Sequence, residues 1–246
     1  MSRRTRRLLT ILVSVMILVT AGCAVSIRKG HKAVTPEQRK LRVACIGDSI
    51  TYGAGVQMTR DRDAYPVMLS DLLGEDYSVL NYGISGKTLL NETKTPYREM
   101  AFFEESQRIQ PDIVLIMLGT NDSKEFNWNA GEYERQLGEF VDIYKNLPGS
   151  PEVYLMTCCA AYGAEDNDVV AFHVNKSVIA NELNPMIRRV AVKCEIPVID
   201  IYNVTKDHPE YFVDGVHPNA EGNEVIAQAV YEALVSSGSV SGSKES

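Results

Sequence analysis

Ser49 is the first residue in this 246-residue sequence whose setting suggests chemistry. It lies in the segment Gly47–Thr51, directly after an apolar run that predicts a strand. Where a strand turns into a helix, a serine hydroxyl is exposed at the sheet edge and its backbone N–H points outward. This setting suits a nucleophile whose attack places negative charge beside that N–H group. Taken alone, the pattern fits a helix-capping serine equally well.

A second chemical element lies near the C-terminus, in Asp214-Gly215-Val216-His217. In a tight turn, residues three apart lie on one side, so the Asp214 carboxylate can accept a hydrogen bond from the His217 imidazole. That bond would fix the imidazole tautomer and stabilise the cation formed when His217 takes a proton from Ser49. The alternative is a helix-capping aspartate beside a surface histidine.

Two further segments offer hydrogen-bond donors at predicted strand ends. Residues Asn81–Gly86 follow the second predicted strand, and Gly119–Asp122 follow the third. A glycine lets a backbone N–H approach an anion closely, and an asparagine side chain adds a donor. These segments could together stabilise an oxyanion.

Alternating strand-like and helix-like segments would position these groups. The predicted strands are apolar along their whole length, which favours strands covered on both faces of a parallel sheet; they span 41–46, 77–80, 113–118, 153–157 and 197–201. Helical patterns occur near 65–73, 97–109, 131–146 and 177–193, and again over residues 225–234. Five strands with intervening helices predict a doubly wound α/β fold, with the site at the carboxyl ends of the strands.

The four blocks, in this order, resemble the SGNH/GDSL hydrolase family across nearly the whole predicted domain. The resemblance implies a flavodoxin-like three-layer sandwich and ester hydrolysis through an acyl-enzyme, without a cofactor or metal. It implies Ser49 as nucleophile, His217 as general base and Asp214 as its orienting partner. The implied oxyanion hole comprises the Ser49 N–H, the Gly86 N–H and the Asn121 side chain.

The resemblance leaves the substrate open, because the family includes carbohydrate deacetylases, lipases, lysophospholipases and thioesterases. No long apolar insertion follows a predicted strand, so we expect short acyl groups, acetyl on a carbohydrate above all. Trp128 and Tyr162 could contact a sugar, or could simply pack on the core. The alternatives are an esterase for longer acyl chains and a non-catalytic carbohydrate-binding relative, which the complete set of catalytic residues disfavours.

The N-terminus predicts export. Residues 1–22 combine four arginines with a short apolar run, as in a signal peptide, and Thr20-Ala21-Gly22-Cys23 resembles a bacterial lipobox. We therefore expect a lipoprotein of the cell envelope, lipidated at Cys23 and held at the membrane. An ordinary signal peptide or an uncleaved anchor are the alternatives. A linker (23–40), the hydrolase domain (41–236) and a flexible tail (237–246) would follow.

The net charge of the chain narrows the classes of possible binding partner. The formal net charge is −7, which disfavours nucleic acid as a partner and leaves a small-molecule or glycan ester as the expected one.

Four cysteines of the predicted domain, Cys45, Cys158, Cys159 and Cys194, could form disulfides in an exported protein. Their positions in predicted strands favour buried free thiols, and no metal-binding spacing appears.

Overall fold

The computed structural model of the protein describes residues 39–241. The predicted signal peptide (1–22), Cys23, most of the predicted linker and the last five residues lie outside this range. Within it, no helix has both the length and the apolar character needed to cross a bilayer.

Five parallel strands form the centre of the domain, in the order β2-β1-β3-β4-β5. Their bounds are Leu41–Gly47 (β1), Tyr77–Gly83 (β2), Ile113–Met117 (β3), Glu152–Met156 (β4) and Val198–Ile199 (β5). This is the flavodoxin-like order, in which the chain leaves β1 toward opposite edges of the sheet. The predicted doubly wound α/β fold with five parallel strands is confirmed. Its switch point lies between β1 and β3, where such folds bind ligands.

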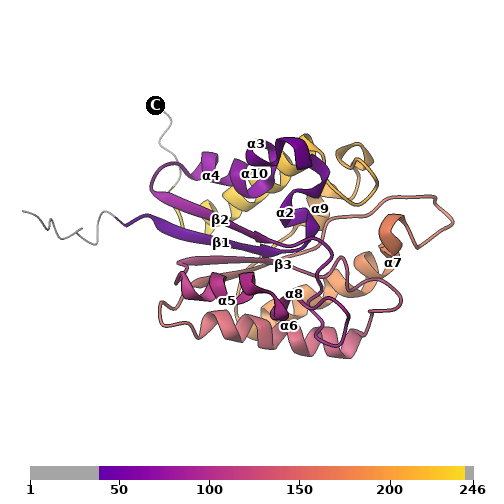
Figure 1. The fold of residues 1–246 in the computed structure, drawn as a ribbon, viewed down its shortest axis with the longest axis horizontal. Helices are drawn as coiled ribbons and strands as arrows, with labels where there is room; N and C mark the ends of the chain where they lie inside the picture. Colours follow the sequence, from indigo (N-terminus) through magenta and orange to yellow (C-terminus); the bar gives the residue numbers. More distant parts are fainter. Residues whose placement is uncertain (1–38, 242–246) are drawn as a thin grey trace, which may run out of the picture. The chain divides into compact units, whose positions relative to one another are not determined.

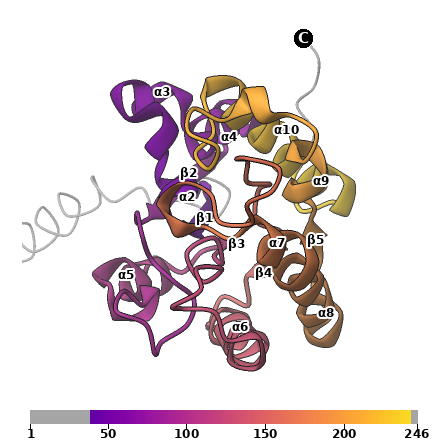
Figure 2. The same ribbon diagram turned by 90° about the vertical axis from the view of Figure 1, so that its right-hand side faces the viewer.

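Helices cover both faces of the sheet (Figures 1 and 2), with α4, α9 and α10 on one face and α5, α6 and α8 on the other. The helices are α2 (Ser49–Tyr52), α3 (Arg60–Asp63), α4 (Tyr65–Leu73), α5 (Ala101–Arg108), α6 (Ala130–Lys145), α7 (Lys176–Val178), α8 (Asn184–Cys194), α9 (Ile201–Thr205) and α10 (Ala220–Ser237). A π-helical segment, η5 (Ile179–Leu183), joins α7 to α8, and short 3₁₀ turns span Ala54–Thr59 (η2), Tyr97–Glu99 (η3), Ala171–His173 (η4) and Pro209–Tyr211 (η6).

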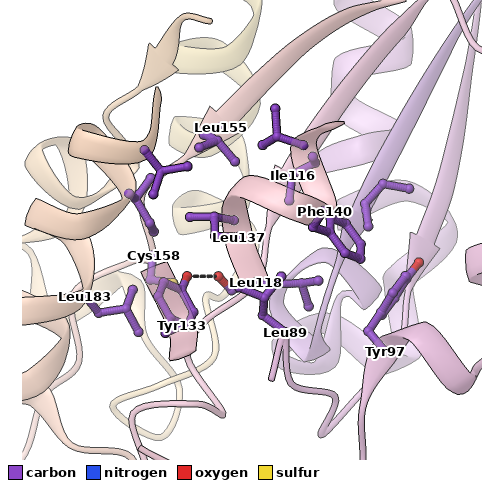
Figure 3. Close-up of a cluster of buried hydrophobic side chains, with 14 of the residues drawn as sticks. Leu89, Tyr97, Ile116, Leu118, Tyr133, Leu137, Phe140, Leu155, Cys158 and Leu183 are labelled. Atoms are coloured by element: carbon purple, nitrogen blue, oxygen red, sulfur yellow. Dashed lines mark hydrogen bonds between the residues drawn. The ribbon is translucent and has the colours of Figure 1, made fainter. Parts of the chain in front are cut away.

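The continuous apolar character of the strands follows from burial on both faces. In β1, Ala44 and Ile46 pack in one core, whereas Val43 and Cys45 pack in the other. Figure 3 shows the core beneath α6, where the Tyr133 hydroxyl donates to the Leu118 carbonyl oxygen at 2.7 Å. That bond satisfies a buried phenol and a carbonyl just beyond β3.

The described cysteines are free, as predicted. Cys45, Cys158 and Cys159 are buried, and Cys194 is half-buried. Cys158 and Cys159 contribute to opposite cores, which is the alternation expected of adjacent residues in extended chain.

Three predicted elements differ from the structure. The fifth strand ends at Ile199 because the Asp200 carboxylate caps α9 by accepting from the Asn203 N–H. The helix predicted over 97–109 is interrupted at Met100, whose backbone is extended. The predicted flexible tail is wrong for its first residues, since Val240 is only 5% exposed and packs in the core beside α10.

Candidate active site

The turn that carries Ser49 is fixed by a buried carboxylate. Asp48 follows β1 and caps α2, with its carboxylate accepting from the Ile50 N–H at 2.9 Å. Ser49 is therefore the first residue of that short helix, where its own N–H lacks an intrahelical partner. Its side chain is 7% exposed. The structure thus has the strand-to-helix serine that the sequence predicted.

The turn before α10 brings Asp214 and His217 to this serine. One Asp214 carboxylate oxygen, Oδ1, accepts from the backbone N–H groups of Val216 and His217 at 3.0 and 2.8 Å. The other, Oδ2, lies 2.8 Å from His217 Nδ1, and His217 Nε2 lies 3.0 Å from Ser49 Oγ. Gly215 closes the turn with a φ of +83°, which a side chain would disfavour.

This geometry assigns a direction to each hydrogen bond. The ionised Asp214 carboxylate can only accept, so Nδ1 carries the proton and Nε2 is left to accept from the Ser49 hydroxyl. Burial acts to raise the pKa of the Asp214 carboxyl. The hydrogen bonds from the His217 imidazole and from two backbone N–H groups outweigh it and hold that pKa below its ordinary value. The three groups form a continuous hydrogen-bonded chain.

The predicted oxyanion donors line the same cavity as Ser49, which has a volume of about 550 Å³. Gly86 is exposed there, and Asn121 is 6% exposed just after β3. The Asn121 amide donates to the Lys87 carbonyl oxygen at 3.1 Å and makes a longer contact of 3.4 Å to Asp48 Oδ2. The longer contact is the weaker one, so that N–H is available to an anion beside Ser49.

Two buried carboxyls support this arrangement. Burial raises the pKa of Asp48 to about 6, although the Ile50 N–H and the nearby His217 act against the rise. Burial raises the pKa of Asp122 to about 7, against hydrogen bonds from the Leu90 and Leu89 N–H groups. Asp122 thereby ties the segment after β3 to the segment after β2, which carry the two predicted donors.

Neither Trp128 nor Tyr162 is among the residues that line the cleft. The Trp128 ring packs on Tyr133 at a centroid distance of 5.5 Å, and its Nε1–H donates to Glu182. The Tyr162 ring packs on Phe212, and its backbone N–H donates to the Gly215 carbonyl oxygen at 2.7 Å. Of the two readings left open by the sequence, the structure favours packing for both residues.

Phe172 and Lys124 line the cleft instead, and sequence reasoning missed both. The Phe172 ring is 53% exposed and meets the His217 ring edge-on, with centroids 4.9 Å apart. Phe172 lies in the loop before α7, which crosses the carboxyl end of the sheet in Figure 2. Its φ of +59° is rare for a residue with a side chain. No sequence pattern predicts such a backbone conformation.

A sequence profile of the GDSL-like lipase/acylhydrolase family matches residues 45–225. An acetylxylan esterase of Xylanibacter ruminicola is 31% identical over 218 residues, covering 81% of this chain and 44% of that protein. A multidomain esterase of Ruminococcus flavefaciens is 26% identical over 235 residues, covering 79% of this chain and 28% of that protein. The chain thus spans less than half the length of these two relatives.

Solved structures share the fold. A carbohydrate acetylesterase from Sinorhizobium meliloti has a TM-score of 0.65 and 20% identity, covering 80% of this chain and 99% of that one. The aryl esterase of M. smegmatis has a TM-score of 0.62 and 21% identity, covering 80% and 99%. With a family profile matched over residues 45–225, the chain belongs to the GDSL-like lipase/acylhydrolase family of ester hydrolases.

Proposed function

We propose that the protein is a serine esterase that removes acetyl groups from a carbohydrate. The observation that carries the proposal is the hydrogen-bonded chain from Asp214 through His217 to Ser49, at the edge of an open cleft. This chain supplies an activated nucleophile and a base already held in the required tautomer.

In the first half of the reaction, Ser49 Oγ bonds to the acyl carbon while His217 Nε2 takes the hydroxyl proton. The carbonyl electron pair moves onto oxygen, where the N–H groups of Ser49 and Gly86 and the Asn121 amide stabilise it. The electron pair then returns, the bond to the alcohol oxygen breaks, and His217 gives its proton to that oxygen. Asp214 stabilises the imidazolium in between.

Water completes the reaction. It transfers one proton to His217 and bonds through its oxygen to the acyl carbon of the acyl-enzyme. Collapse of this second intermediate breaks the bond to Ser49 Oγ, which regains the proton from His217. The products are acetate and the free sugar hydroxyl.

The acetyl group and the carbohydrate are supported by the cleft and by one relative. The cleft lining combines small or polar residues, Ser85, Gly86 and Thr120 among them, with the apolar side chains of Phe172, Val174, Val213 and Val216. The relative with 31% identity carries the name acetylxylan esterase. A mixed lining of this kind suits a short acyl group on a sugar, because a sugar has apolar C–H faces as well as polar hydroxyl groups.

An apolar groove beside the cleft favours an alternative function, an esterase for longer acyl chains. It has a volume of about 590 Å³ and shares Gln57 and Ser85 with the cleft. Ile84, Met100 and Phe102 give it an apolar lining. An acyl chain leaving Ser49 in this direction would bury methylenes, each contributing about 0.8 kcal/mol.

Activity across acyl chain lengths separates the two functions. We expect kcat/KM for 4-nitrophenyl esters to be highest for acetate and to fall beyond butyrate, and acetylated xylooligosaccharides to release acetate. The Ser49→Ala protein is the control for activity from contaminants. A maximum at octanoate or longer would favour the apolar groove as the acyl site and contradict the proposal.

A further inference from the structure

A second cavity adjoins the cleft and has no part in the catalytic steps above. It has a volume of about 480 Å³ and shares two lining residues with the cleft, Gly86 and Lys124. Its remaining lining comes from residues 92–95, after β2, and from Phe126 and Asn127, after β3. A chain-like substrate whose ester lies at Ser49 could therefore extend past Gly86 into this second cavity.

Phe126 gives the second cavity an exposed aromatic wall. Phe126 is 72% exposed, and its ring meets the His173 ring at a centroid distance of 6.2 Å. The loop that carries Phe126 is nevertheless well fixed. The Asn127 amide donates to the Asn121 carbonyl oxygen at 2.8 Å, and the Asn127 and Trp128 N–H groups donate to the Lys124 carbonyl oxygen at 2.8 and 2.9 Å. A ring held outward by a fixed loop suits contact with the C–H face of a sugar, because burying it then gains apolar contact at little entropic cost.

Lys124 places a positive charge at the junction of the two cavities. Its side chain is half-buried, and among the described residues its ammonium group forms neither a hydrogen bond nor an ion pair. The buried carboxyls of Asp48 and Asp122 act on it only through space. An ammonium group that makes no direct contact of its own is free to pair with an anionic group of a ligand.

The remaining charges of the second cavity are consistent with an anionic ligand. Lys94 adds a second, exposed ammonium group. The acidic residue of the lining, Glu92, accepts a hydrogen bond from the Gln136 amide at 2.7 Å. The cavity thus presents two ammonium groups against the single carboxylate of Glu92, in a chain whose formal net charge is −7.

We propose that the second cavity binds a sugar unit that carries a carboxylate, a uronic acid adjacent to the acetylated sugar, with Lys124 holding the carboxylate and Phe126 contacting the sugar face. This inference rests on the proposed function and specifies its substrate class: acetylated polysaccharides that contain uronic acid. The acetylated sugar occupies the cleft beside Ser49, and the glycan continues past Gly86.

Three acetyl esters test the inference. They are 4-nitrophenyl acetate, a neutral acetylated xylooligosaccharide, and the same oligosaccharide with a uronic acid next to the acetylated xylose. We expect kcat/KM of the wild type to be roughly tenfold or more higher for the acidic oligosaccharide than for the neutral one, as a charge-assisted contact supplies. Lys124→Met should reduce this ratio to near one, and added salt should lower it in the wild type.

Two further variants complete the design. Lys206→Met removes an exposed charge at the end of α9, outside both cavities, and should keep the wild-type ratio. Phe126→Ala should lower kcat/KM on both oligosaccharides several-fold, by about the worth of one aromatic contact, relative to the aryl acetate.

Each contrary outcome has a distinct meaning. Equal losses on all three substrates in Lys124→Met would make Lys124 a counter-ion of Asp48 and Asp122, and would overturn the inference. A wild type that is active on the aryl acetate and shows no preference between the oligosaccharides would overturn it as well. A folded wild type that hydrolyses none of the three esters would instead contradict the proposed function itself.

Discussion

The turn that carries Ser49 and the loop that carries Phe172 both face the cleft, yet they are built in opposite ways. The turn is buried: Asp48, Ser49 and Thr51 are 1%, 7% and 0% exposed. Its backbone packs directly on the end of β2, where the Asn81 amide donates to the Thr51 carbonyl oxygen at 2.8 Å. Neighbouring main chain therefore determines where Ser49 lies.

The loop over residues 161–175 is mostly exposed; its two ends are bonded to Gly215 and Ser123, and the part between them is held by hydrogen bonds within the segment. Val169 and Asn175 form an antiparallel bridge, and the Lys176 ammonium donates to the Ala164 carbonyl oxygen at 2.6 Å. At its tip, Phe172 and His173 have φ angles of +59° and +62°. The core of the fold thus fixes Ser49, whereas an exposed loop forms the wall opposite it, and we infer that the first region reacts and the second selects the substrate.

The largest expected effect is the loss of activity when the buried region loses Ser49 or its partner His217. Ser49→Ala and His217→Ala should each lower kcat by a factor on the order of 10⁴–10⁶. Because the two side chains act as one hydrogen-bonded unit, the double variant should be little worse than either single one. Steady-state kinetics on 4-nitrophenyl acetate, with circular dichroism to verify folding, measure this. A folded Ser49→Ala protein that keeps more than a small fraction of activity would refute the assignment.

Asn121 tests whether the donors beside the turn act on the transition state. Asn121→Ala should lower kcat by roughly 10²–10³ with little change in KM, since an oxyanion forms only as the reaction proceeds. The same kinetics on 4-nitrophenyl acetate separate kcat from KM. A rise in KM with kcat unchanged would mean that the amide binds the ground state instead.

Much of this site could be predicted from the sequence because its chemistry depends on short segments. The Asp214–His217 spacing determines a turn, and a glycine between them permits it. Gly86 and Asn121 follow strands whose apolar runs are plain, so their meeting at one sheet edge follows from the parallel fold. Each of these inferences needed only local sequence and the direction of the strands.

Phe172 and Lys124 could not be predicted in this way. The placement of Phe172 depends on a backbone conformation that its own side chain disfavours. Lys124 matters because two cavities meet beside it, and that arrangement depends on segments far apart in the chain. Trp128 was misleading for the opposite reason. It is the only tryptophan and follows Asn121 closely in the sequence, but its ring packs on Tyr133 and its N–H donates to Glu182.

Substitution of one glycine in each region tests how tightly the two regions are packed. A Cβ at Gly83, at the end of β2, would lie 2.2 Å from the Tyr52 backbone nitrogen. A Cβ at Gly163, in the loop, would meet chiefly the movable Val170 side chain. Gly83→Ala should therefore destabilise the domain by about 3 kcal/mol or more, and Gly163→Ala by about 1 kcal/mol or less. Urea unfolding measures both, and similar losses would contradict the contrast.

The buried carboxyl of Asp122 should make the stability of the domain depend on pH. Its pKa is about 7 in the folded chain and 3.8 for an ordinary aspartate, so between these values the folded state holds a proton that the unfolded state has released. The contribution of this group to stability must therefore fall as pH rises through that window.

Between about pH 5 and about pH 8, the wild type should lose on the order of 2 kcal/mol relative to Asp122→Asn. The variant itself should be less stable throughout, because an amide can accept only one of the two N–H bonds that Asp122 receives from Leu89 and Leu90. Unfolding free energies of both proteins across this range are the measurement. Parallel pH curves would show that Asp122 is ionised throughout.

The smallest effect, and the most specific to the loop, concerns Phe172. Alanine and glycine both remove the ring that contacts His217, but only glycine also relieves the left-handed backbone. Phe172→Gly should therefore be more stable than Phe172→Ala by about 1 kcal/mol, as thermal or urea unfolding would measure.

If the ring serves to contact substrate, both variants should show the same loss in kcat/KM on an acetylated oligosaccharide, roughly two- to tenfold, because one aromatic contact is missing in each. A glycine variant that is much less active than the alanine variant would mean that stiffness at the tip matters more than the ring. Unchanged activity in both would mean that the loop only covers His217, and the contrast between a buried reacting region and an exposed selecting loop would then fail at its second half.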